Sequence, residues 1–254
     1  EKLGKLYEEK GDEEKALDIY RDVISIREKV IDYNGEKVIW NEDLCLSYLK
    51  LGDFFMKKED AYWSEEYYYD GSSKCAKLLV LEPENKEYQK ILLRSHYKLA
   101  KAYRNQKKYI LAASVLMDAI KVLGVDVTSK NALNDMQIRL LIQESDLYLS
   151  WSWYLLLSEE YAKISSVLKR VVDYLPEKED SHVAIHSNLA HSLLLSGETD
   201  EAESIYGMFK GYVFKDGKVW DQLMIDDFKA LRESGINSRE FDRIAKEVFL
   251  INLE

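Results

Sequence analysis

A small residue recurs within one local sequence pattern at five places in this chain of 254 residues. In each place an apolar residue precedes the small one, and a second large apolar residue follows three positions after it. The five small residues are Gly4, Gly52, Ala100, Ser152 and Ala190. A small side chain on one helix allows another helix to approach closely, so the recurrence predicts a series of helical hairpins.

The composition favours helices over strands. Only two prolines and eleven glycines occur, whereas an all-β protein of this length needs many more turn residues. The net charge of −10 argues against nucleic acid and anionic lipid as partners, because both attract a surplus of Lys and Arg. No apolar run approaches the roughly 18–20 residues that cross a bilayer, so no membrane segment is expected.

The first repeat carries further positions with a physical role. Gly11 is placed to end the first helix in a left-handed conformation, and Ala16 to leave a gap that faces Gly4. Tyr7 and Tyr20 are expected to fill the space between hairpins. This spacing resembles that of the tetratricopeptide repeat family, and the likeness extends over residues 1–212. The resemblance implies a right-handed superhelical solenoid, all-α, of about five helix–turn–helix repeats.

The repeats are longer than the family's usual unit. Gly4, Gly52 and Ala100 lie 48 residues apart, against roughly 34 for the ordinary repeat. The extra length falls in helix, because the pattern continues over 22–30 and over 73–81, where Pro83 follows. Trp40 and Tyr88 then open the next units. In this the chain resembles bacterial tetratricopeptide proteins whose repeats have lengthened helices.

The predicted organisation is a repeat array over 1–214, with a first repeat truncated at its N-terminus, followed by two capping helices over 215–254. Residues 124–133 read as a polar loop, near which the superhelical pitch should change. Asn237 and Glu240 have the spacing of a capping box for the last helix. Because an exposed terminal repeat has an apolar face, the last two helices are expected to cover it.

The candidate partner-binding residues lie on the first helices of the later repeats, which line the concave face in this architecture. A basic stripe on the third repeat, at spacings of three and four, has Tyr97 beside it and could attract an acidic peptide segment. A solvated helix face balanced by acidic neighbours explains the same stripe. The candidates are Arg94, Tyr97, Lys98, Lys101, Arg104, Trp153, Leu156 and His191, and Lys108 continues the stripe.

Chaperone-binding members of the family hold a peptide's terminal carboxylate with Lys and Asn side chains on the first helices. The corresponding places here hold Lys5, Lys50 and Lys98. Since the full set is absent, the sequence does not predict this carboxylate clamp.

Three further clusters have a structural and a functional interpretation. Consecutive aromatics at Trp63 and Tyr67 to Tyr69 cannot all face inward, so some are expected on a partner surface. His182 and His186 lie one turn apart, as zinc ligands can, but without a supporting motif we expect packing or surface roles for them and for His191, and no metal. Cys45 and Cys75 fit neither a disulfide framework nor a zinc site, and are predicted to be buried free thiols.

No catalytic motif is present, so the sequence predicts a protein that is not an enzyme and needs no cofactor. The leading hypothesis is a cytoplasmic scaffold that binds a protein or peptide in its concave groove. The alternative is a regulatory or sensor module of a larger multidomain protein whose effector domain lies outside this chain. The expected partner is a protein or peptide, with an acidic segment as one possibility, and neither nucleic acid nor a membrane.

Overall fold

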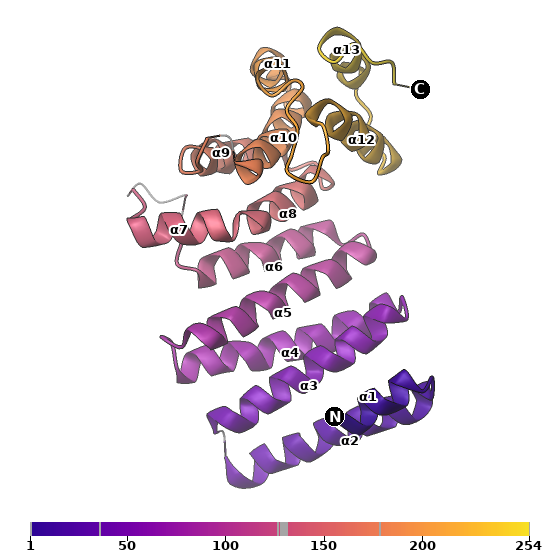
Figure 1. Cartoon of the computed structure of the whole chain (residues 1–254). Coiled ribbons are helices and arrows are strands. Elements are labelled where there is room, and N and C mark those ends of the chain that lie inside the picture. Colours follow the sequence, from indigo (N-terminus) through magenta and orange to yellow (C-terminus); the bar gives the residue numbers. More distant parts are fainter. Residues whose placement is uncertain (1, 36, 126, 128–131, 178, 254) are drawn as a thin grey trace. The chain divides into compact units, whose positions relative to one another are not determined.

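The computed structural model describes residues 2–35, 37–125, 127, 132–177 and 179–253. These residues form thirteen α-helices and no strand beyond an isolated antiparallel bridge between Val213 and Val219. The chain divides into two compact units, residues 1–122 and 123–254 (Figure 1). The prediction of an all-α repeat solenoid is confirmed, since successive helices pack against one another as hairpins within each unit.

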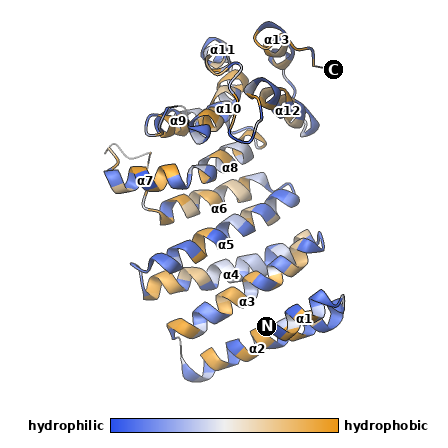
Figure 2. Ribbon diagram, viewed as in Figure 1, coloured by the Kyte–Doolittle hydropathy of each residue, from blue (hydrophilic) through white to orange (hydrophobic). Residues whose placement is uncertain are grey.

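The first unit holds three hairpins. Their helices are α1 (Lys2–Glu9) and α2 (Glu13–Asn34), α3 (Val38–Lys57) and α4 (Ala61–Leu81), and α5 (Lys86–Asn105) and α6 (Tyr109–Val122). With 22 residues in α2 and 21 in α4, the lengthened helices are confirmed, whereas α6 has 14. Apolar and polar residues alternate along the helices (Figure 2). Helix α5 buries one stripe and exposes the other, whereas α3 is buried on most sides between Ser47 and Phe55.

The second unit begins with α7 (Asp135–Gln143) and α8 (Ser145–Leu156), which are separated only at Glu144. The remaining helices are α9 (Tyr161–Val172), α10 (Asp180–Leu195), α11 (Thr199–Met208), α12 (Trp220–Glu233) and α13 (Arg239–Glu247). The sequence predicts a polar loop at residues 124–133. Residues 126 and 128–131 of that segment lie outside the described part of the chain.

One turn recurs in all five hairpins, seven residues after each small residue. The residue there has a positive φ and the next N–H donates to the carbonyl five residues back, at 2.9–3.0 Å. This is the Schellman pattern, which satisfies carbonyls that a helix end leaves without partners. The five turn residues are Gly11, Glu59, Lys107, Glu159 and Gly197. The predicted left-handed Gly11 is confirmed, and the prediction of five hairpins with it.

The small residues Gly4 and Gly52 each lie against a tyrosine ring of the second helix in the same hairpin. A Cβ added at Gly52 would lie 2.4 Å from Tyr68, and one at Gly4 would lie 2.6 Å from Tyr20. Tyr20 also contacts Phe54 of the next hairpin, with ring centroids 6.1 Å apart. The ring is therefore packed inside its own hairpin as well as between hairpins.

The prediction of free cysteines is wrong. Cys45 on α3 and Cys75 on α4 form a disulfide, with Cα atoms 5.3 Å apart. Both are fully buried, as expected, but the antiparallel packing of α3 on α4 places residues 30 positions apart side by side. Two cysteines with no repeated spacing gave no signal for this pairing.

Helix α12 ends at Glu233, and Gly235 follows it with φ 93°. The predicted capping box is wrong in its first residue. Ser238 is the N-cap of α13, and its hydroxyl accepts from the backbone N–H of Glu240 at 3.2 Å. Asn237 instead donates to the carbonyl of Gly235. In the described part of the chain, no helix has the length and apolar character needed to cross a membrane.

Candidate functional site

A groove of about 860 Å³ runs across the first helices of the three hairpins in the first unit. We call it the lysine groove. Helices α1, α3 and α5 supply its walls, and one tyrosine from each of α2 and α4 reaches it from behind. Its lining comprises Lys2, Lys5, Glu8, Glu9, Tyr20, Lys50, Asp53, Phe54, Met56, Lys57, Tyr68, Tyr97, Lys98 and Lys101.

The lining carries six lysines and three carboxylates, a surplus of three positive charges in a chain whose net charge is −10. All three carboxylates have lysine partners: Lys57 pairs with Glu8 at 2.8 Å, Lys5 with Glu9 at 3.7 Å, and Lys98 with Asp53. Within the described residues, Lys2 and Lys101 make no ion pair. The groove therefore presents positive charge to whatever enters it.

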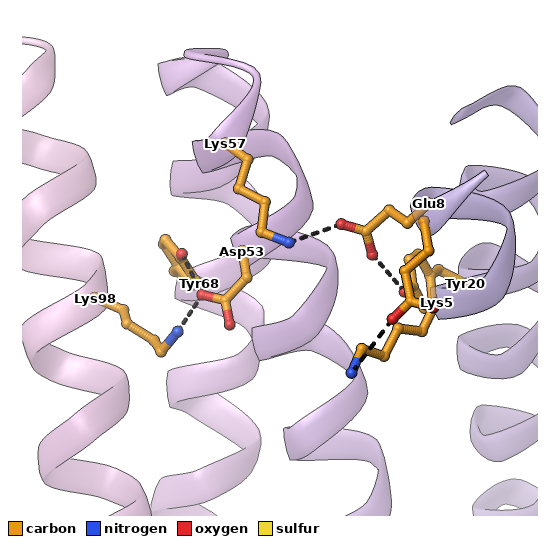
Figure 3. A network of polar contacts seen from close by, with 8 residues as sticks. Lys5, Glu8, Tyr20, Asp53, Lys57, Tyr68 and Lys98 are labelled. Atoms are coloured by element: carbon orange, nitrogen blue, oxygen red, sulfur yellow. Dashed lines mark hydrogen bonds and ion pairs between the residues drawn. The ribbon is translucent and has the colours of Figure 1, made fainter. Parts of the chain in front are cut away.

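Two tyrosine hydroxyls donate hydrogen bonds to two of these carboxylates, Asp53 and Glu8 (Figure 3). Tyr68 donates to Oδ1 of Asp53 at 2.7 Å, and Tyr20 donates to Oε2 of Glu8 at 2.7 Å. Burial and the nearby Asp53 carboxylate raise the pKa of Tyr68 well above its usual value. Burial raises the pKa of Glu8 as well, but hydrogen bonds from Lys57 and Tyr20 outweigh it and lower that pKa overall. Both carboxylates are thus held by a fixed donor and a lysine.

The structure brings three of the predicted residues into this groove: Tyr97, Lys98 and Lys101 of α5. Tyr97 is 49% exposed, so its ring is available at the wall. Arg94 and Arg104 lie on the same helix and are exposed, but they do not line the groove. Arg104 donates to the side chain of Asn105 at 3.2 Å. The basic stripe is therefore split between the groove and the surface beside it.

The candidates in the second unit differ from one another. Trp153 on α8 is partly exposed and remains a candidate contact. Leu156 and His191 are 0% exposed, which corrects their assignment as direct contacts of a partner. His191 is buried by the chain's own α12. The Phe228 ring centroid lies 5.4 Å from that of the imidazole, and Oδ2 of Asp227 lies 3.1 Å from Nε2.

All three lysines at the family's clamp positions, Lys5, Lys50 and Lys98, line the groove. Lys57, Tyr20 and Tyr68 also line the groove, and the sequence analysis did not include them among the candidate contacts. A signal for the tyrosines exists, since Tyr20 and Tyr68 each follow their small glycine by 16 residues. The groove therefore spans the first three hairpins, one or two hairpins earlier than the predicted centre of binding.

The histidine pair has a packing role. His186 is buried, its Nδ1 bonds to the carbonyl of His182 at 2.8 Å, and its ring lies 5.0 Å from Phe209. Burial lowers the pKa of His182 and of His186, so both rings are neutral near pH 7. Among the described residues, no three His, Cys, Asp or Glu side chains gather in a geometry that could hold a metal ion.

These features define an all-α repeat protein of helical hairpins with a charged groove along the first helices. A family model described as tetratricopeptide repeat matches residues 1–30 and 93–122, in the first and third hairpins. These matches show tetratricopeptide repeats in the first and third hairpins, and the same turn recurs in all five hairpins. Repeats of this kind generally mediate contacts between proteins.

Solved structures of similar shape are distant in sequence. BtubC (BKLC) from P. vanneervenii is 12% identical with a TM-score of 0.51, and the match covers 93% of this chain and 91% of that one. A Podosopora anserina protein described as a kinesin light chain with nearly identical TPR-like repeats is 15% identical with a TM-score of 0.49, and the match covers 93% and 95%. No curated protein matches this chain. The likeness to BtubC is one of fold.

Proposed function

We propose that the chain is a non-catalytic scaffold whose lysine groove binds an acidic segment of a partner protein. The observation that carries this proposal is the charge balance of the groove: each carboxylate in the lining already has a lysine, and lysines remain in surplus. An acidic peptide supplies the missing negative charge. Its apolar side chains would find Tyr97 and Met56 in the same groove.

The position of Lys101 makes it the central residue of the test. Its side chain is exposed, lies in the groove, and forms no ion pair within the described residues. Changing it to glutamate therefore removes attraction for an acidic ligand without breaking an internal contact. Lys98 is a poorer choice, because its loss would leave Asp53 without its cation.

The experiment measures the affinity of a fluorescein-labelled decapeptide that alternates Glu with Leu, and of its Gln counterpart, at 150 mM salt. We expect saturable binding of the acidic peptide, at least tenfold weaker binding of the Gln peptide, and a similar loss in Lys101→Glu. Thermal unfolding of that variant should stay within a degree or two of the parent chain.

Lys29→Glu is the matched control, because Lys29 is exposed on α2, outside the groove lining, and the substitution changes the net charge by the same amount. We expect it to retain the parent affinity within about twofold. Arg104→Glu should have an intermediate effect, since Arg104 lies on α5 beside the groove. Equal losses in Lys101→Glu and Lys29→Glu would show that only net charge attracts the peptide, and the proposal would fail.

A further inference from the structure

A second, smaller groove lies in the first unit on the side of the second helices. Its volume is about 310 Å³, and α2, α3 and α4 supply its lining. We call it the Trp63 groove. The residues that matter for its chemistry are Glu28, Tyr48, Trp63, Glu66, Tyr67 and Asp70. None of them lines the lysine groove, so the two surfaces are separate.

Trp63 and Tyr67 of this groove form an aromatic cluster with Phe55 behind them. The three ring centroids lie 6.0 Å (Trp63–Tyr67), 5.4 Å (Tyr67–Phe55) and 6.1 Å (Phe55–Trp63) apart. These contacts hold the Trp63 ring in one orientation. Trp63 is 41% exposed, so part of the indole remains open to a ligand. The face of an indole attracts cations more strongly than other aromatic rings.

The charges around the aromatic cluster are mainly acidic. Glu28, Glu66 and Asp70 line the groove, against Arg21 as its one cationic lining residue among those described. Glu28 accepts from the Tyr48 hydroxyl at 2.6 Å. Glu66 and Asp70 have no ion pair or hydrogen bond within the described residues, although Lys74 lies one turn beyond Asp70.

The crowding of these acids shows in the pKa of Asp70. Burial is the largest cause that raises this pKa, and the negative charges of Glu66 and Glu28 raise it further. The positive charge of Lys74 lowers it in part. A cation entering the groove would relieve this repulsion. The acidic side chains and the aromatic cluster are independent features, and both favour a cationic ligand.

We propose that the Trp63 groove binds an arginine side chain of a partner protein. The guanidinium is planar and always charged, so it can lie on the indole and donate to a carboxylate at its edge at once. The volume of about 310 Å³ is at the lower end of the roughly 300–1,000 Å³ that ligand pockets span, which suits one side chain better than a folded surface. This inference goes beyond the proposed function, because it names a second surface with the opposite charge.

The probe is an octapeptide that alternates Arg and Gly, measured against the intact chain by calorimetry at 150 mM salt. The comparison peptide has citrulline in place of arginine, which keeps the planar shape and removes the charge. We expect saturable binding of the arginine peptide and at least tenfold weaker binding of the citrulline peptide. The double variant Glu66→Gln/Asp70→Asn should bind the arginine peptide at least fivefold more weakly.

The matched control is Asp18→Asn/Asp32→Asn, which removes two exposed carboxylates of α2 that do not line the groove. It should bind like the parent chain, and the Glu66/Asp70 variant should unfold at the same temperature or higher because crowded charges are removed. Trp63→Leu keeps apolar bulk and should lose at least threefold in affinity. Equal weakening by both double variants, or equal binding of both peptides, overturns the proposal.

The two surfaces can be tested separately. Lys101→Glu should leave the affinity for the arginine peptide within about twofold, and Glu66→Gln/Asp70→Asn should leave the affinity for the Glu–Leu peptide within the same margin. Failure of the lysine groove to bind the acidic peptide therefore does not decide the outcome for the Trp63 groove.

Discussion

The hydroxyl of Tyr68 donates to Oδ1 of Asp53 across 2.7 Å, and Lys98 of the next hairpin pairs with the same carboxylate. One carboxylate thus joins three helices at the floor of the lysine groove. Tyr206 and His191 occupy the equivalent places in the fifth hairpin, where the Tyr206 hydroxyl and Nδ1 of His191 lie 2.8 Å apart. A tyrosine 16 residues after the small residue therefore contacts the side chain that follows the small residue in both hairpins.

The buried tyrosines predict a loss of stability in alkali. Burial raises the pKa of Tyr68 and of Tyr206, and the carboxylates Asp53 and Asp227 raise them further. In the unfolded chain both phenols ionise near pH 10, so above that pH the folded state holds more protons than the unfolded state and its stability falls as pH rises. Absorbance at 295 nm should show that Tyr68 and Tyr206 ionise only together with unfolding, and their replacement by Phe should remove that part of the signal.

The conservative variant Tyr68→Phe separates the hydroxyl from the ring. It should cost about 1–2 kcal/mol of unfolding free energy, because Asp53 loses a buried donor but keeps Lys98. Urea unfolding of the variant should show a lower midpoint with an unchanged m-value. A midpoint equal to that of the parent chain would mean that the bond contributes nothing to stability.

The packing of Tyr68 on Gly52 predicts that the effect of a Gly→Ala change on stability depends strongly on its position. Gly52→Ala places a Cβ 2.4 Å from the ring, and the resulting displacement should cost about 1–3 kcal/mol. Gly207→Ala is the matched change on α11, where nothing lies within 4 Å, and it should stabilise by up to about 1 kcal/mol through helix propensity. Thermal unfolding of the two variants should shift in opposite directions.

The repeated turn predicts stabilising substitutions. Glu59, Lys107 and Glu159 adopt positive φ values of 58–62°, in positions where the first and fifth hairpins have glycine. A left-handed conformation costs an ordinary L-residue roughly 1–2 kcal/mol. Glycine avoids this cost, but part of the gain is lost because glycine increases the conformational entropy of the unfolded chain. Each change to Gly should therefore raise the unfolding free energy by about 0.5–1 kcal/mol. Gly197→Ala, the reverse change, should lower it.

The sequence predicts the register of this fold well because the register is local. Spacing alone predicts the positions of the small residues and of the turn at Gly11. It also predicts the lengthened α2 and α4, of which α4 ends just before Pro83. Exposure is not local. His191 directly follows its small residue, as Asp53 and Lys101 follow theirs, yet α12 covers it. No pattern on α10 shows where a helix about 30 residues later will lie.

The same limit applies to the cysteines and to the groove. Cys45 and Cys75 are paired by the packing of α3 on α4, which spacing does not encode. The six groove lysines come from three helices, and only those on α5 form a visible stripe in sequence. Charge on a shared face becomes apparent only when the hairpins are stacked.

The disulfide predicts a measurable dependence on redox conditions. It closes a loop of about 30 residues, for which the chain-entropy relation gives roughly 3–4 kcal/mol. Cys45→Ala/Cys75→Ala should unfold at a lower denaturant concentration by a corresponding amount. Because both sulfurs are buried, a thiol reductant should act on the parent chain only under conditions that open the fold. Disulfides persist mainly in oxidising compartments, which disagrees with the cytoplasmic location expected from sequence.

Mass spectrometry of the alkylated, non-reduced chain provides the direct check on the disulfide. No alkylation is expected before reduction in denaturant, and two modified cysteines are expected afterwards. Alkylation of both cysteines in denaturant without any reductant would contradict the pairing.

The buried contacts of His191 predict a structural role that can be separated from binding. Its ring nitrogens face the Tyr206 hydroxyl at 2.8 Å and Asp227 at 3.1 Å, which joins α10 to α11 and α12. His191→Phe fits the surrounding aromatic rings but leaves both partners unsatisfied, so it should cost about 2–4 kcal/mol. Since the lysine groove lies wholly in the first unit, that loss should appear as faster amide exchange in α10 to α12, while the affinity for the acidic peptide stays unchanged. A variant that keeps its exchange protection and loses peptide binding would return His191 to the list of partner contacts.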